Sequence, residues 1–223
     1  MDKPTSVYGE EKPRLRGVSH QFAFFGFGLG NLILFAATTE RRATVAILIY
    51  ALSVAFLYGV SALYHRGTWS ERALSRIRRL DHSAIFLLIA GSYTPLFMLL
   101  LPADYAGGHP LRLVWFFTCL GILKTLVWPR SPGWITTVLA IATGWCAIRH
   151  VLALAPSIGT LSFTLLALSG VAYTLGGAVY AVRRPNPFPR IFGYHEVFHA
   201  LVITGGLFHY AHLWILLDTV GAV

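Results

Sequence analysis

Seven apolar stretches dominate the chain, and each is long enough, or nearly so, to cross the ~30 Å hydrocarbon core of a membrane as a helix. They cover residues 18–38, 43–64, 83–101, 113–128, 134–155, 157–182 and 197–217. The main polar connections between them lie at 66–81, 102–112 and 183–194. The pattern predicts an all-α membrane protein, a seven-transmembrane-helix bundle over residues 18–223, with an amino-terminal tail over residues 1–17.

A count of six helices is the main alternative. The fourth stretch is short and contains Lys124, and the fifth contains Arg149 and His150. Only Ala155-Pro156-Ser157 separates the fifth stretch from the sixth.

The composition agrees with a membrane location. Hydrophobic residues make up 56% of the 223 residues and charged residues 12%, although the charged share of a soluble domain is about 25%. Cys119 and Cys146 both lie in apolar stretches, so we expect reduced packing residues and no disulfide. His20, Gln21 and Asn31 interrupt the first stretch, which favours a retained helix over a cleaved signal peptide.

The distribution of positive charge predicts the orientation. With seven helices, all but four of the 18 Lys and Arg residues fall on one side of the membrane. The four exceptions are Arg41, Arg42, Arg112 and Arg149. Because positive residues are retained in the cytoplasm, the amino terminus is predicted to be cytoplasmic and the carboxy terminus outside.

The same distribution explains the net charge of +9, so nucleic-acid binding is not needed to account for it. Arg72, Arg76 and Arg79 could share one face of a short amphipathic helix in the 66–81 connection, where they would contact anionic lipid headgroups. The tail is expected to be a flexible cytoplasmic segment on the membrane surface.

Two histidines four residues apart, His195 and His199, open the last apolar stretch. On a helix they would share one face, about 6 Å apart along the axis. Such a pair can hold a zinc ion if a third ligand comes from another segment and one position stays open for water or substrate.

The predicted topology brings further polar residues to the same depth. His65 ends the second helix, Asp81 and His82 precede the third, and His20 lies in the first. Ionisable groups inside helices cost about 2.5–3.5 kcal/mol each at the bilayer centre and by default mark function. The sequence therefore predicts one polar layer near the cytoplasmic face.

Each of these residues also has a structural interpretation. Asp81 could be the N-cap of the third helix, and His65 could be an interfacial histidine. Ser61, one turn before His65, could bond a backbone carbonyl or orient the imidazole. His20 could be an additional polar partner.

The remaining histidines are not expected to join such a site. His209 and His212 lie at least ten residues beyond His199, or about 15 Å along a helix, which is too far to share a metal. Interfacial or packing roles are predicted for His82, His109 and His150.

Several motifs occur in a distinctive order: Arg16-Gly17-Val18-Ser19-His20, Ser61-Ala62-Leu63-Tyr64-His65-Arg66, Arg79-Leu80-Asp81-His82, Gly91-Ser92-Tyr93-Thr94-Pro95 and Phe192-Gly193-Tyr194-His195-Glu196-Val197-Phe198-His199. In order and spacing they resemble the hemolysin III family. That bacterial family belongs to the group that includes the progestin and adiponectin receptors, and it is more distantly similar to the alkaline ceramidases. The resemblance covers nearly the whole chain.

The resemblance implies seven transmembrane helices in a bacterial inner (plasma) membrane, with zinc near the cytoplasmic face. By match to the family pattern, His65, His195 and His199 would be the zinc ligands, with Asp81 holding a water at the metal and Ser61 supporting the site. Three imidazoles and a water make an open tetrahedral site. Asp81 could then serve as general base and later as general acid.

Three functions are compatible with this site. The first is a metal-dependent hydrolase of membrane lipid amides or esters, as the ceramidase similarity implies. The second is a non-catalytic zinc-containing membrane sensor or receptor with a lipid-like ligand. The third is the cytolytic pore implied by the family name. We rank it lower because a pore is expected to show charged rings or a large amphipathic surface, and the central helices offer little of either.

His195-Glu196-Val197-Phe198-His199 also fits the His-Glu-x-x-His signature of zinc metalloproteases, in which the Glu is the general base. Such enzymes commonly take a third ligand downstream, but the only later acid is Asp218, nineteen residues past His199. An upstream third ligand stays open, but Ser61, His65 and Asp81 together favour the resemblance to the hemolysin III family. The adiponectin receptors carry Gln where Glu196 stands, so an accessory role is expected for Glu196.

Overall fold

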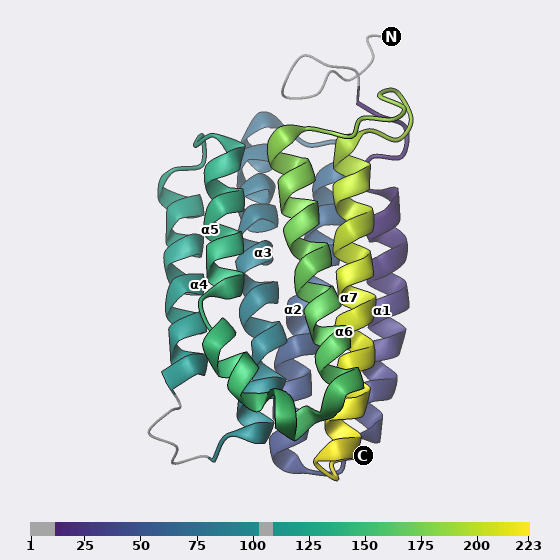
Figure 1. Ribbon diagram of the computed structural model, residues 1–223. Helices are drawn as coiled ribbons and strands as arrows, with labels where there is room; N and C mark the ends of the chain where they lie inside the picture. The colour runs from purple at the N-terminus through teal and green to yellow at the C-terminus, as the bar shows by residue number, and fades with distance from the viewer. Residues whose placement is uncertain (1–11, 103–108) are drawn as a thin grey trace.

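The computed structural model describes residues 12–102 and 109–223 (Figure 1). Seven helices make up this part of the chain: α1 (Val18–Ala37), α2 (Arg41–Arg66), α3 (Glu71–Leu100), α4 (His109–Val127), α5 (Gly133–Trp145), α6 (Ile148–Val182) and α7 (Tyr194–Thr219). Six of them are long and apolar enough to cross a membrane, and α5 is the shorter exception. The expectation of an all-α membrane protein is confirmed.

The helices form an up-and-down bundle, as Figure 1 shows. α2 packs against α1 and α3, and α6 packs against α7. Helix α1 begins at one end of the bundle, and α7 ends at the other (Figure 1). The start of α7 and the end of α2 therefore share one end of the bundle, which we call the amino-terminal end.

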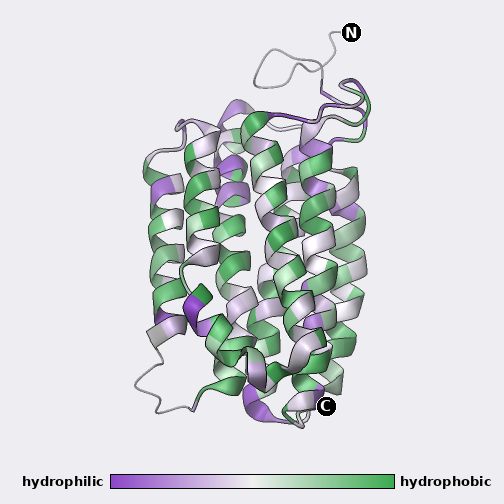
Figure 2. Ribbon diagram, in the orientation of Figure 1, coloured by the Kyte–Doolittle hydropathy of each residue, from purple (hydrophilic) through white to green (hydrophobic). Residues whose placement is uncertain are grey.

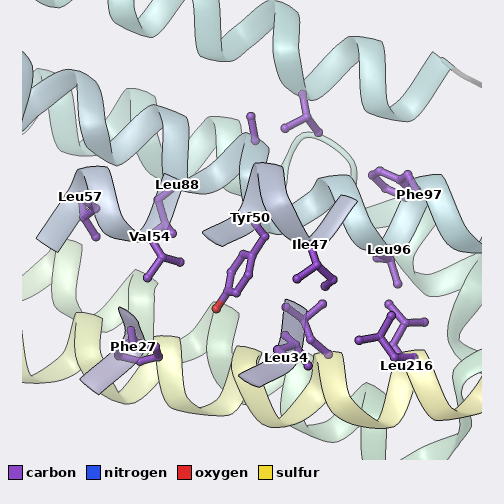
Figure 3. Packing of buried hydrophobic residues seen from close by; sticks show 14 of the residues in the cluster. Phe27, Leu34, Ile47, Tyr50, Val54, Leu57, Leu88, Leu96, Phe97 and Leu216 are labelled. Carbon is purple, nitrogen blue, oxygen red and sulfur yellow. The ribbon is translucent and has the colours of Figure 1, made fainter. Parts of the chain in front are cut away.

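The bundle is apolar outside as well as inside. Figure 2 shows hydrophobic residues along the middle of the helices and most hydrophilic ones near the ends. Phe22 is 73% exposed and Leu32 67% exposed, which lipid tails accommodate and water does not. The core around Leu34, Ile47 and Tyr50 is fully buried between α1, α2 and α7 (Figure 3).

The polar connection expected at 66–81 is much shorter in the structure. Helix α3 begins at Glu71, and the Ser70 hydroxyl accepts a hydrogen bond from the Ala73 amide. The prediction of a connection up to Asp81 was wrong, as was the N-cap interpretation of Asp81, which lies inside α3. The reason is that hydropathy marks where a helix enters hydrocarbon, while basic side chains extend a helix into the headgroup layer.

The boundary between the fifth and sixth helices also differs from the prediction. Helix α5 ends at Trp145, and Pro156 lies inside α6. The non-helical residue of α6 is Gly159, with φ 76° and ψ 160°. Glycine adopts positive φ without the steric cost that other residues meet, so the kink falls there and not at Ala155-Pro156-Ser157.

The described part of the tail is held against the bundle. The Arg14 amide donates to the Arg190 carbonyl at 3.0 Å, and the Leu15 amide donates to the Ile191 carbonyl at 3.1 Å. The expectation of a flexible tail is therefore wrong for residues 12–17, which we call the amino-terminal arm. For residues 1–11 that expectation lies outside the described residues.

Candidate metal centre

Three histidines from two helices meet at the amino-terminal end of the bundle. His65 is the last residue but one of α2, and His195 and His199 lie in the first turns of α7. One ring nitrogen from each lies within 4.8 Å of the others. The Nε2 atoms of His65 and His195 are 3.1 Å apart.

The donor set and the spacing fit a metal ion. Two ligand nitrogens of a tetrahedral zinc, each at about 2.0–2.1 Å, lie about 3.4 Å from each other, close to the separation of His65 and His195. His199 is only 1% exposed, and its Nδ1 has no hydrogen-bond partner. A buried polar atom without a partner is costly, and these three imidazoles could hold a metal ion. The zinc-ligand role of these residues stays a prediction.

His20 supports His199 directly. The two rings are stacked, with centroids 3.6 Å apart and planes 9° apart. His20 Nδ1 lies 2.9 Å from the Ser61 hydroxyl. The prediction of His20 as an additional polar partner is confirmed, and its stack on His199 had no signal in the sequence.

Ser61 connects this pair to the carboxylate. Its hydroxyl is hydrogen-bonded to Asp81 as well as to His20. Because a serine hydroxyl has one proton, donation to Asp81 requires His20 to donate from Nδ1. Ser61 thus reaches the histidines through His20, whereas the sequence left open a bond to a backbone carbonyl or to the His65 imidazole.

Glu196 has a structural role in this arrangement. One carboxylate oxygen accepts from the Gly193 amide at 2.8 Å and caps α7, and the other accepts from Arg16 Nε at 2.5 Å. With both oxygens engaged and 1% exposure, Glu196 is not available as the general base of a metalloprotease. Sequence reasoning missed Arg16, although a buried acid at a helix start needs such a partner.

The histidines open into one long cavity of about 1200 Å³. Ser61, Asp81 and the three histidines line it together with apolar side chains, including Leu88, Leu96, Phe163 and Leu166. His209 also lines the cavity, and it lies about 15 Å along α7 from His199. The cavity therefore combines a polar end with an apolar interior.

The histidines that were not expected to join the site lie outside the cluster, where the structure describes them: His82, His150, His209 and His212. His212 Nδ1 is paired with the Ser162 hydroxyl at 2.7 Å. Among the side chains that the structure describes, the candidate metal group contains only His65, His195 and His199. His109 cannot be compared, because its side chain lies outside the described part.

The fold and the site together define a class of protein: a multi-pass α-helical membrane protein with a buried histidine cluster at one end of its bundle. The family model described as Haemolysin-III related matches residues 8–210, and the chain belongs to this family. The resemblance noted in the sequence is thereby confirmed.

Individual relatives agree with this assignment. The chain is 31% identical over 176 residues to a Hemolysin-3 homolog of Bacillus subtilis (strain 168), covering 78% of each protein. It is also 31% identical over 163 residues to Hemolysin-3 of Bacillus cereus, covering 73% of this chain and 71% of the relative. Similarity extends to Monocyte to macrophage differentiation factor of Homo sapiens, 20% identical over 200 residues, with 88% and 80% covered.

Proposed function

We propose that this protein is a zinc-dependent hydrolase of amide or ester bonds in membrane lipids. The observation that carries the proposal is the shared cavity, in which three imidazoles and the Asp81 carboxyl adjoin an apolar interior. A water nucleophile at the edge of a membrane suits a lipid whose reacting bond lies at that depth. The excess of positive residues supports a cytoplasmic location for this end, and the Bacillus relatives favour a bacterial inner membrane.

His65, His195 and His199 are the residues that would hold the zinc. When bound by three neutral imidazoles, zinc lowers the pKa of water at its open position toward about 7 and polarises a carbonyl. Asp81 accepts a proton from the attacking water and returns it to the leaving amine or alcohol. Ser61 orients the Asp81 carboxyl through its hydroxyl, and His20 fixes Ser61.

The apolar walls of the cavity contribute binding and orientation. Leu88, Leu96 and Phe163 would pack against an acyl chain, and each buried methylene contributes about 0.8 kcal/mol. Holding the chain in this direction brings the amide or ester next to the histidines. Orientation of this kind can account for several kcal/mol of barrier lowering.

A non-catalytic zinc-containing sensor is the second candidate. The cluster joins residues 130 positions apart, from α2 and α7, so a metal would cross-link two helix ends and a lipid ligand could shift them. The names of two relatives, Hemolysin-3 and a Hemolysin-3 homolog, suggest cytolysis as a further candidate. We rank it lower because a pore needs polar side chains along its length.

Elemental analysis of purified wild type and His65→Ala tests the metal site first. One zinc per chain in the wild type and none in the variant would support the three-histidine site. Zinc retained by His65→Ala would contradict it, because His65 joins His195 and His199 only in this fold.

Lipid turnover then separates hydrolase from sensor. Asp81→Asn is nearly isosteric and should keep the zinc while lowering turnover of an amide or ester lipid by about 100-fold or more. His150→Asn, at a residue outside both the metal cluster and the cavity lining, is the control. Zinc binding without turnover of any lipid amide or ester by the wild type would favour the sensor.

A further inference from the structure

The entrance of the cavity carries a strong excess of positive charge. Among the described residues that line the cavity, six are Lys or Arg and one, Asp81, is acidic. The six are Lys12, Arg16, Arg66, Arg78, Arg130 and Arg183. A cavity bordered by one sign of charge focuses the potential on a ligand of the opposite sign.

These cations come from separate elements but share the amino-terminal end. Lys12 and Arg16 belong to the amino-terminal arm, Arg66 ends α2, Arg130 precedes α5 and Arg183 follows α6. Two of them are tied to the histidine cluster. Arg66 follows His65 in the chain, and Arg16 bonds Glu196, which follows His195. An anion at this entrance would therefore lie close to the metal ligands.

The positive side chains influence one another. The pKa of Lys12 is lowered because the residue is partly desolvated and because Arg16 and Arg66 lie nearby. Arg16 is already paired with Glu196. Since like charges destabilise each other, an anionic ligand beside Lys12 and Arg66 would offset the electrostatic cost of their closeness.

Membrane topology alone does not require this arrangement. A positive cytoplasmic face needs cations on one side of the bundle but not around one cavity. Arg72 and Arg76 show the alternative, because both are exposed on α3 and neither lines the cavity.

We infer that the cationic entrance binds the phosphate of an anionic lipid headgroup, while the acyl chain of that lipid lies in the apolar interior of the cavity. The inference rests on the proposed function, since it names the substrate class of the same site. No bond to phosphorus breaks; the phosphate positions the amide or ester beside the histidines. Neutral lipids with the same acyl chain would bind more weakly.

The test uses two probes that differ only in the phosphate: 1-dodecanoylglycerol 3-phosphate and neutral 1-dodecanoylglycerol. Binding is measured to the full chain in phosphatidylcholine nanodiscs, with protein-free nanodiscs as the blank. The double variant Lys12→Gln/Arg66→Gln is compared with Arg72→Gln/Arg76→Gln, which removes the same charge away from the cavity. Zinc content and thermal unfolding establish that each variant is folded.

We expect the wild type to bind the phosphate probe more tightly than the neutral one. The cavity double variant should lose about 30-fold in affinity for the phosphate probe, at about 1 kcal/mol for each cation, and little for the neutral probe. Equal binding of the two probes by the wild type would overturn the inference. So would an equal loss in the control variant, since surface charge would then account for the effect.

Inorganic phosphate in large excess separates a lipid headgroup from a free anion. Failure to displace the lipid probe supports the headgroup assignment, and full displacement overturns it. Fatty acid release is recorded in the same samples. Tight phosphate-dependent binding without release would contradict only the hydrolase proposal, while release from both probes with equal affinity would contradict only the headgroup site.

Discussion

His20 lies face to face with His199, with ring centroids 3.6 Å apart, and bonds Ser61 through the edge of the same ring. One side chain therefore touches both halves of the candidate site. Its face contacts a predicted metal ligand, and its edge holds the hydroxyl that orients Asp81. The two contacts can be removed separately.

His20→Phe keeps a ring against His199 but loses the bond to Ser61. We expect zinc affinity to stay near the wild-type value and lipid turnover to fall about 10-fold, because Asp81 loses its oriented partner. His20→Asn keeps a donor for Ser61 but removes the stacked ring, and should weaken zinc binding by about 10-fold. Competitive zinc titration and turnover assays measure both effects, and identical behaviour of the two variants would contradict separate roles.

The pairing of Arg16 with Glu196 should matter for stability more than for chemistry. Arg16→Gln leaves a carboxylate that is 1% exposed without its charged partner, and we expect a loss of about 3 kcal/mol. Glu196→Gln in the same chain should restore part of it. Thermal unfolding in detergent measures the change, with Arg14→Gln as an exposed control.

Measuring zinc content together with turnover tests whether Glu196 has a structural or a catalytic role. The Glu196→Gln variant should keep its metal and most of its turnover, because the carboxylate caps α7 and binds Arg16. Complete loss of turnover in a folded, zinc-loaded Glu196→Gln protein would revive the metalloprotease interpretation.

Gly17 allows the arm to pass closely over α2. It has φ 79°, and a Cβ built there would lie 2.5 Å from the Cβ of His65. Gly17→Ala should destabilise the fold by about 1–3 kcal/mol through the positive φ, and should lower zinc content by displacing His65. Gly26→Ala, whose Cβ would meet no atom within 4 Å, is the control. Equal zinc content in the two variants would argue against the close contact.

Acidification should release the metal. Imidazoles must be neutral to bind zinc. Zinc affinity should therefore fall as the pH drops into the range in which these imidazoles gain protons, with up to three protons taken up per ion because His65, His195 and His199 act together. A chelator titration across pH measures the slope. A curve without any pH dependence would exclude imidazole ligands.

Much of the site was predictable from the sequence because it depends on helix periodicity and direction. His195 and His199 share a face at four-residue spacing, and alternating helix direction brings His65 to the same end. The Arg16–Glu196 bond was not predictable, because it joins residues 180 positions apart with no local signature. The start of α3 was missed for another reason: apolar runs report hydrocarbon depth and not where helical backbone begins.

Because of the amino-terminal arm, a tag or fusion partner would affect the site differently at the two ends of the protein. Backbone hydrogen bonds join Arg14 and Leu15 to the segment that leads into α7. The last helical turn before the carboxy terminus lies at the other end of the bundle (Figure 1). A fusion partner or affinity tag pulling on the arm would act on the first turn of α7 and its histidines. Reporters placed after Val223 would leave that turn undisturbed, so carboxy-terminal tags are the sound choice for measuring metal content and turnover.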